Sequence, residues 1–244
     1  MIDLSTLEKP TVFKSYVHSY DLDKFDIKNL AVTFKKQLLT CYGHNGKLEN
    51  HVTQDIYFED FLNKNFDLIK AKYWQFKNLI GQEIDSGIVK KYASIVAKYL
   101  SFTKNIESTR CTFRLQLPPW YFPYHFDAGE NLFLNLYGKR QIKILSHEHG
   151  QKFAPSLNGF NTEVDPNLEQ IYFLNPGDAI FIPAGYFHEF TSVGENLLVG
   201  ISTSLKFTSR IYVDMENEFK KTYQTQSAIV ESKKDFLNIK GGDN

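Results

Sequence analysis

A succession of short segments with the side-chain alternation of β-strands is the feature that most constrains the fold of this chain. The first segment begins at Cys111, with the apolar set Phe113, Leu115 and Leu117 and the polar set Thr112, Arg114 and Gln116. Side chains alternate in this way on a half-buried strand. Further strand patterns follow at residues 124–127, 132–137, 141–145, 170–174, 179–182, 187–191 and 197–204, with glycines and prolines between them. Short strands at such close spacing predict an antiparallel barrel or sandwich.

The residues before Cys111 show helical rather than strand periodicity. Residues 86–100 place apolar side chains on one face and lysines on another, and shorter helical patterns lie at residues 27–39 and 57–69. We therefore expect three regions along the chain. Residues 1–110 form a mostly helical N-terminal region that packs on the barrel, residues 111–205 form the catalytic core, and residues 206–244 form a C-terminal helix and a loose tail.

Charge and cysteine content exclude several classes of function. The chain has 28 Lys plus Arg and 28 Asp plus Glu, so no excess positive charge favours nucleic acid or an anionic membrane surface. Cys41 and Cys111 lack the spacing of a thiolate zinc site and suit a reducing compartment. No apolar segment reaches membrane-spanning length, and charges interrupt the start of the chain where a secretory signal is apolar. We expect a cytoplasmic or nuclear protein with no membrane partner.

The sharpest chemical pattern is the triplet His125-Phe126-Asp127. Residues two apart on a strand point to the same face, so the imidazole and the carboxylate can reach one metal ion. His188, at the start of a later strand pattern, can provide a third ligand. Two imidazoles and one carboxylate leave coordination positions open on the opposite side of an octahedral ion, which suits non-haem Fe(II). Such a triplet alone is common by chance, so the prediction depends on all three residues together.

Three segments share a pattern with a known enzyme family: residues 125–133 (HFDAGENLF), 136–145 (LYGKRQIKIL) and 176–189 (PGDAIFIPAGYFHE). From about Thr112 to Leu205 the chain resembles the JmjC-type, factor-inhibiting-hypoxia-factor-like branch of the cupin oxygenases. The resemblance implies a mainly β fold, with a double-stranded β-helix (jelly-roll or cupin) barrel flanked by α-helices. It also implies an iron-dependent dioxygenase that couples oxidative decarboxylation of 2-oxoglutarate by O2 to hydroxylation, or to demethylation by way of hydroxylation.

In this family a lysine commonly pairs with the distal carboxylate of 2-oxoglutarate, and Arg140 occupies the matching position here. Alternation supports an inward Arg140, because Ile142 and Ile144 share its face. A guanidinium can bind a carboxylate through two parallel hydrogen bonds, so the substitution is chemically sound. The alternative is that Arg140 is a solvated hairpin residue beside Lys139.

Two further residues are candidate contacts of the co-substrate. Asn131 matches an asparagine of the family, and a polar residue that faces a barrel interior needs a partner such as a bound dicarboxylate. Thr203 lies on the last strand, where relatives place a small polar residue, but a β-branched residue also simply favours a strand. His147 and His149 could mimic a metal motif, and we interpret them as residues of a solvated loop.

The sequence leaves the oxidised substrate open. Family resemblance favours a protein side chain, in a protein or peptide substrate. The alternatives are a small molecule or RNA as substrate, a cupin enzyme that needs no 2-oxoglutarate, or a non-catalytic metal-binding cupin-fold protein. By analogy with relatives, a homodimer through the helical pattern at residues 211–237 is a further hypothesis.

Overall fold

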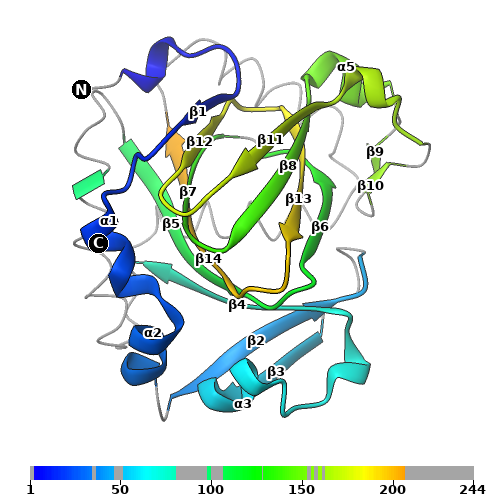
Figure 1. The fold of residues 1–244 in the computed structure, drawn as a ribbon. Coiled ribbons are helices and arrows are strands. Elements are labelled where there is room, and N and C mark those ends of the chain that lie inside the picture. The colour runs from blue at the N-terminus through cyan, green and yellow to red at the C-terminus, as the bar shows by residue number, and fades with distance from the viewer. Residues whose placement is uncertain are drawn as a thin grey trace, which may run out of the picture.

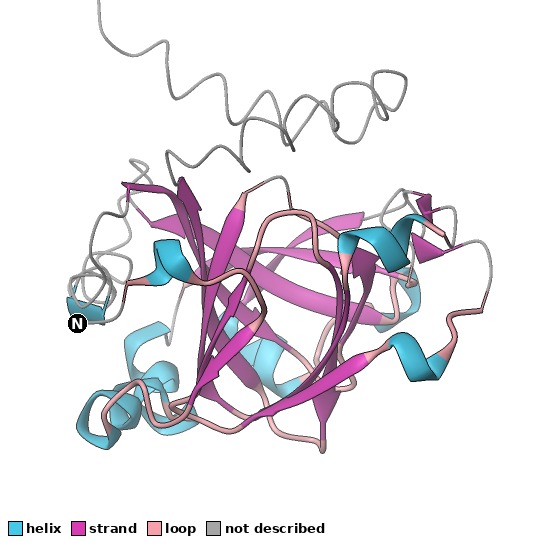
Figure 2. Cartoon of the chain, turned by 90° about the horizontal axis from the view of Figure 1, so that it is seen from above, coloured by secondary structure: helices cyan, strands magenta, loops and turns pink. Residues whose placement is uncertain are grey.

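The computed structural model describes residues 3–34, 37–46, 52–80, 98–99, 107–127, 129–152, 155–156, 159–160 and 163–206. Two antiparallel sheets dominate these residues and enclose the centre of the molecule (Figure 1). Figure 2, a view from above, shows the strands gathered at the centre and most helical segments around them. The expected mainly β fold of the cupin type is confirmed.

The smaller sheet has four strands. Its order is β11 (Gln170–Leu174), β8 (Lys139–Leu145), β13 (Phe187–Val193) and β6 (Tyr121–His125). β11 begins and ends where its sequence pattern does, and β8 and β13 contain theirs. The strand expected at residues 124–127 lies earlier, because β6 ends at His125 and leaves Asp127 beyond it. The sequence alternation of β8 is also confirmed, because Arg140, Ile142 and Ile144 are buried on one face while Gln141 and Lys143 are partly exposed on the other.

The larger sheet has eight strands. Its order is β1 (Thr11–Phe13), β12 (Ala179–Ile182), β7 (Glu130–Tyr137), β14 (Leu198–Lys206), β5 (Glu107–Gln116), β4 (Tyr73–Ile80), β2 (Leu38–His44) and β3 (Val52–Tyr57). Four of these strands come from the N-terminal region. They extend the sheet well beyond the segment in which the strand patterns were recognised.

The described part of the N-terminal region contains more strand than its periodicity predicts. The α-helices given for this part are α1 (Ser19–Leu22), α2 (Ile27–Phe34) and α3 (Phe58–Asn63), with 3-10 turns at Leu4–Thr6, Asp23–Phe25 and Leu68–Lys70. The helical pattern at residues 27–39 ends early because Leu38 already pairs with Tyr57 in the sheet. Lys64 adopts a left-handed conformation with φ of 56° and ends α3. Apart from Lys98 and Tyr99, the helix expected at residues 86–100 lies outside the described residues, as does the one at 211–237.

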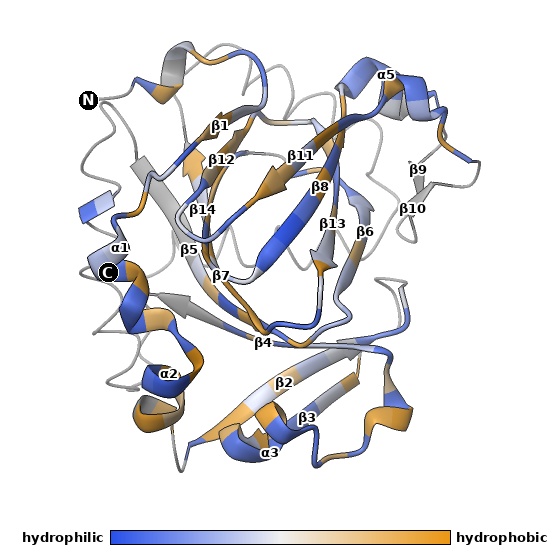
Figure 3. Ribbon diagram, viewed as in Figure 1, coloured by the Kyte–Doolittle hydropathy of each residue, from blue (hydrophilic) through white to orange (hydrophobic). Residues whose placement is uncertain are grey.

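Apolar side chains fill two separate layers. The outer face of the larger sheet packs against the N-terminal helices through a core that includes Phe25, Leu30, Phe34, Phe113, Leu115, Leu132, Leu134 and Ile201. The barrel interior holds a second cluster of Phe133, Ile142, Ile144, Leu174, Ile180 and Ile182. Figure 3 shows this hydrophobic colouring along the central strands, with a hydrophilic stretch at the start of β8. Both faces of β5 are thus covered from Thr112 to Gln116, and the polar side chains of Thr112 and Gln116 are buried rather than exposed to solvent.

The long polar loop expected between Ser146 and Asn167 contains short elements of its own. Helix α5 (His147–Gln151) begins where the Ser146 hydroxyl accepts a hydrogen bond from the His149 amide at 3.3 Å. The short strands β9 (Pro155–Ser156) and β10 (Gly159–Phe160) pair with each other, and a 3-10 turn follows at Pro166–Leu168. Among the described residues, no helix has both the length and the apolar character needed to cross a membrane.

Candidate metal centre and co-substrate pocket

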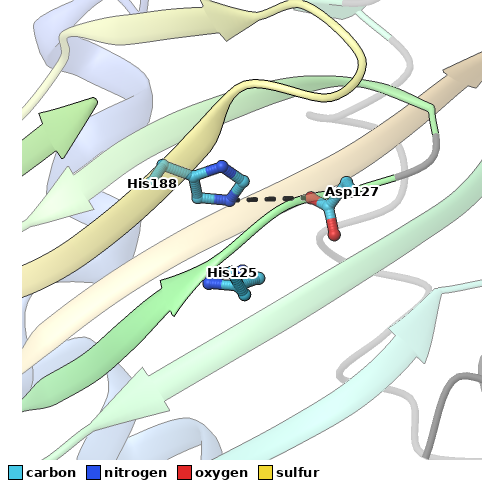
Figure 4. A group of neighbouring side chains, drawn as sticks. All are labelled: His125, Asp127 and His188. Atoms are coloured by element: carbon cyan, nitrogen blue, oxygen red, sulfur yellow. Dashed lines mark ion pairs between the residues drawn. The ribbon is translucent and has the colours of Figure 1, made fainter. Parts of the chain in front are cut away.

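His125, Asp127 and His188 meet at one end of the barrel. His125 ends β6 and is the direct cross-strand partner of His188 on β13. One ligand atom from each residue lies within 4.8 Å of the others, and Nε2 of His188 is 3.7 Å from Oδ2 of Asp127 (Figure 4). Asp127 follows the end of the strand rather than lying on it, and its carbonyl accepts a hydrogen bond from the Gly185 amide at 3.0 Å. Gly185 has φ of 77° and so allows the turn that aims His188 at the carboxylate.

Backbone carbonyls fix the tautomer of both histidines. Nδ1 of His125 lies 2.9 Å from the Pro123 carbonyl, and Nδ1 of His188 lies 2.9 Å from the Tyr186 carbonyl. A carbonyl oxygen can only accept, so each Nδ1 carries the proton and each Nε2 keeps its lone pair. This arrangement orients both imidazoles for a metal ion.

The charge states of the group also suit a cation. Burial, together with the neighbouring His188, lowers the pKa of His125 to about 3, so its ring is neutral at pH 7. Burial alone would raise the pKa of Asp127, but the two histidines and a hydrogen bond from Asn131 outweigh burial and lower it. A neutral His125 imidazole and an ionised Asp127 carboxylate therefore lie together, beside the ring of His188.

Phenylalanine rings line the barrel beside both histidines. Phe122 lies edge-on to His125 with ring centroids 4.6 Å apart, and Phe190 lies edge-on to His188 at 5.6 Å. Phe133 continues this wall, with its ring centroid 5.3 Å from that of Phe190. Aromatic residues near the ligands thus serve as packing that confines the imidazoles.

Arg140 points into the same barrel and is only 1% exposed. Its Nε donates to Oδ1 of Asn135 at 2.8 Å, its Nη1 donates to Oε1 of Gln116, and its guanidinium carbon lies 4.9 Å above the Phe133 ring. Among the described residues, the buried Nη2 has no hydrogen-bond partner. The burial of Arg140 shows that it is not a solvated hairpin residue, and Nη2 is left as a donor for a ligand.

Asn131 contacts a candidate metal ligand directly. Its Nδ2 donates to Oδ2 of Asp127 at 3.0 Å and to the Ser202 hydroxyl at 3.0 Å, and that hydroxyl donates back to Asn131 Oδ1 at 3.1 Å. The sequence pointed to Asn131 as a contact of the co-substrate. In the structure it holds the carboxylate of Asp127.

The structure does not bring Thr203 to this pocket. Thr203 is fully buried and pairs with Leu132, on the face of β14 that also carries Ile201 and packs against the N-terminal helices. Its neighbour Ser202 faces the interior instead, opposite Phe133. The alternation of a strand therefore gives the polar contact to Ser202, one residue away from the position expected.

A family model described as the JmjC domain matches residues 89–212. This segment covers half of the chain and contains the three candidate ligands, Asn131 and Arg140. The chain belongs to the JmjC domain family. The family comprises cupin-like oxygenases that use Fe(II) and 2-oxoglutarate, as the sequence resemblance implied.

Solved structures support the fold of this JmjC protein. A crystal structure of Escherichia coli ribosomal oxygenase YcfD is 14% identical with a TM-score of 0.54, and it covers 85% of this chain and 52% of that one. A second structure of YcfD from E. coli gives the same identity and TM-score, with 89% of this chain and 55% of that one covered. The chain thus spans about half the length of these structures. A search of curated proteins found no match.

Two glutamines of the pocket were not singled out from the sequence as site residues. Gln116 was recognised only as part of the polar face of its strand, and Gln75 lies on β4, ahead of the segment matched by the JmjC model. Both side chains are buried, at 4% and 5% exposure. Gln116 could have been found because it shares a strand face with Arg114, while the opposite face of that strand is apolar and buried. No comparable signal marks Gln75.

His147 and His149 lie half-buried on helix α5 rather than in a solvated loop, and neither belongs to the metal-ligating group found among the described residues. Nδ1 of His147 lies 3.2 Å from the Gly185 carbonyl, and its ring packs beside Phe126 and Phe187. Cys41 is buried in the outer core, and burial raises the pKa of its thiol to about 12, so it is an inert packing residue.

Proposed function

We propose that this protein is an Fe(II)- and 2-oxoglutarate-dependent oxygenase that hydroxylates a C–H bond. His125, Asp127 and His188 would hold the iron, because two imidazoles and a carboxylate whose ligand atoms lie within 4.8 Å of one another form the donor set of non-haem Fe(II) oxygenases. Such a set leaves several positions of an octahedral ion for other ligands. Tetrahedral structural zinc is a poorer match, since it needs a fourth protein ligand.

The observation that carries the proposal is the state of Arg140. It is a fully buried arginine whose partners among the described residues are neutral amides, and its Nη2 has no partner. Burial, together with the charge of Arg114, lowers the pKa of Arg140 to about 9, so the guanidinium is still charged at pH 7. An uncompensated buried charge is costly, and a carboxylate bound inside the barrel would compensate it. A 2-oxoglutarate distal carboxylate fits this requirement.

When bound, iron and 2-oxoglutarate supply the oxidising chemistry: O2 gives one oxygen atom to the substrate C–H bond and one to succinate, with release of CO2. The side chains of the protein would position the metal ion. His125 and His188 present fixed Nε2 lone pairs, and Asn131 holds the carboxylate of Asp127. The aromatic wall of Phe122 and Phe190 restricts water beside the imidazoles, which protects a strong oxidant from side reactions.

For the oxidised substrate we propose a side chain of a protein or peptide. The support comes from family membership and from a fold shared with a protein described as a ribosomal oxygenase. A homodimer and a cytoplasmic or nuclear location remain hypotheses from the sequence. Small molecules and RNA are the alternative substrates, and the fold alone does not choose between them.

Two measurements test the oxygenase itself. Anaerobic Fe(II) protein titrated with 2-oxoglutarate should develop the weak visible charge-transfer band of keto acid chelation. With O2 and ascorbate it should then form succinate. Asp127→Ala should abolish both signals, whereas Asp67→Ala, which changes a carboxylate that is 41% exposed, should retain them. A metal-loaded wild-type protein that gives neither the band nor succinate would identify a non-catalytic metal-binding cupin and overturn the proposal.

A further inference from the structure

Two glutamine amides connect Arg140 to a second arginine across three strands. Oε1 of Gln116 on β5 accepts a hydrogen bond from Nη1 of Arg140 on β8. Nε2 of Gln116 donates to Oε1 of Gln75 on β4 at 3.3 Å, and the same oxygen accepts from Nη1 of Arg114 at 3.4 Å. We call Gln116 and Gln75 the amide bridge.

The direction of these hydrogen bonds is set by chemistry. An arginine only donates, so the atom of Gln116 that meets Arg140 must be its amide oxygen. Its amide nitrogen then faces Gln75 and requires an acceptor there. The oxygen of Gln75 satisfies that requirement and is free to receive Arg114 as well. Each amide thus has one orientation in the network.

The amide bridge holds Arg140 without neutralising it. Asn135 accepts from Nε at 2.8 Å, Gln116 accepts from Nη1, and the Phe133 ring lies below the guanidinium plane. These contacts fix the guanidinium plane and leave Nη2, which has no partner among the described residues, to bind a ligand. A glutamate in place of Gln116 would have the same shape but would cancel the charge.

We propose that Gln116 and Gln75 are positioning residues that set the guanidinium of Arg140 so that Nη2 receives the distal carboxylate of 2-oxoglutarate. This inference rests on the proposed function. Gln116 acts on Arg140 directly, and Gln75 acts through Gln116. Because Gln75 lies before residue 89, where the JmjC match begins, the N-terminal sheet extension supplies part of the co-substrate pocket.

Isosteric charge substitution separates this role from packing. Gln116→Glu keeps the volume and forms an ion pair with Arg140, which offsets the loss of the hydrogen bond from Gln116 to Gln75, so the Tm should stay close to that of the wild type. The guanidinium edge would then no longer attract a second carboxylate. The matched control is Gln141→Glu, which adds the same charge on β8 beside Arg140 but on the partly exposed outer face.

The readout is keto acid binding to the Mn(II)-loaded protein, measured by calorimetry without O2. The two probes are 2-oxoglutarate and 2-oxobutanoate, which chelates a metal in the same way but has no distal carboxylate. In Gln116→Glu the affinity for 2-oxoglutarate should fall roughly 10- to 100-fold, as expected for the loss of a charge-assisted contact. The affinity for 2-oxobutanoate should change less than about threefold, and Gln141→Glu should bind both probes like the wild type.

Gln75→Met tests the second half of the bridge. It keeps the length of the side chain and removes the acceptor of Gln116, so 2-oxoglutarate affinity should fall by a smaller factor of roughly 3 to 10, with 2-oxobutanoate unaffected. Equal affinity of wild type and Gln116→Glu for 2-oxoglutarate would overturn the inference while leaving the oxygenase proposal in place. A wild-type protein that binds neither keto acid would instead overturn the proposed function, and the inference with it.

Discussion

Nδ2 of Asn131 donates a hydrogen bond to Oδ2 of Asp127 at 3.0 Å, the same oxygen that lies 3.7 Å from Nε2 of His188. Asn131 is in turn held by the Ser202 hydroxyl on the neighbouring strand β14. Asp127 lies beyond the end of its own strand, so its carboxylate depends on this contact for its direction. The larger sheet therefore orients a ligand that the smaller sheet carries.

Asn131→Ala should weaken metal binding while leaving all three ligands in place. Partners that orient metal ligands typically contribute 10- to 100-fold in affinity, so we expect the dissociation constant for Mn(II) or Fe(II) to rise by roughly that factor. Competition with a chelator of known affinity measures it. Asn167→Ala is the control, since Asn167 bonds only locally to Asp165 among the described contacts. Unchanged metal affinity in Asn131→Ala would show that Asp127 needs no such support.

Substitution of Arg140 should affect the co-substrate rather than the metal. Arg140→Lys keeps a charge but loses the planar fork, so the KM for 2-oxoglutarate should rise by roughly tenfold, and Arg140→Met should raise it further. Metal affinity should stay within about twofold of wild type in both variants. If Arg140→Met turned over 2-oxoglutarate with normal KM, another basic residue would have to bind the distal carboxylate.

Paired substitutions on β14 test which face of the strand serves the pocket. Ser202→Ala removes both hydrogen bonds to Asn131 and should lower metal affinity severalfold. Thr203→Val lies on the opposite face, against the N-terminal helices, and should leave metal and 2-oxoglutarate affinity unchanged while lowering stability by about 1 kcal/mol. Chelator competition and thermal unfolding distinguish the two effects. Loss of 2-oxoglutarate binding in Thr203→Val would restore the sequence-based expectation.

Gly200→Ala should displace the Phe133 ring that lies below the guanidinium of Arg140. A Cβ at Gly200 would lie 2.4 Å from Cζ of Phe133 and 3.1 Å from the Leu134 carbonyl oxygen, so the ring must move. Overpacking of this kind costs about 1 to 3 kcal/mol. We expect a lower Tm and weaker 2-oxoglutarate binding together. Addition of Phe133→Leu should recover part of the Tm because it makes room for the new methyl group, and no recovery would place the strain elsewhere.

Protonation of Asp21 should lower the stability of the folded protein at acidic pH. Burial alone would raise its pKa, but hydrogen bonds from Lys98 at 2.7 Å, Tyr99 at 2.6 Å and Lys24 at 2.9 Å outweigh burial and lower it. A carboxylate with a depressed pKa in the folded state stabilises the protein above its unfolded pKa of about 4, and that contribution is lost as pH falls.

Chemical denaturation of Asp21→Asn tests this linkage. At pH 7 the variant should be less stable than wild type by about 1 to 3 kcal/mol. The difference should narrow as the pH falls below about 4. If the difference in unfolding free energy between wild type and Asp21→Asn does not depend on pH down to acid unfolding, the charge of Asp21 does not stabilise the protein.

The barrel strands could be read from the sequence because their signal is local. Alternation placed Arg140 inside beside Ile142, and the structure confirms this. The strands of the N-terminal region could not be read in the same way, because their pairing is set by partners far along the chain. Gln75, for example, meets Gln116 across β4 and β5, 41 residues apart.

The candidate site was predictable to the same extent. The three ligands could be predicted together from their residue types and spacing, although Asp127 lies beyond the end of β6 rather than on the strand as expected. Thr203 was chosen by position in the last strand, where a shift of one residue reverses the face. Only the pairing of Thr203 with Leu132, rather than with the inward Phe133, decides that it points away.

The hydrogen bonds between β4 and β5 also bear on where the folding unit ends. β5 is enclosed between β14 and β4, so a protein trimmed to the segment by which its family is recognised would expose one edge of β5. An open edge of this length invites pairing with another chain and aggregation. Recombinant fragments and chimeras between relatives should therefore be joined before Leu4, so that β1, the N-terminal helices that cover the outer core and the sheet extension all stay with the barrel.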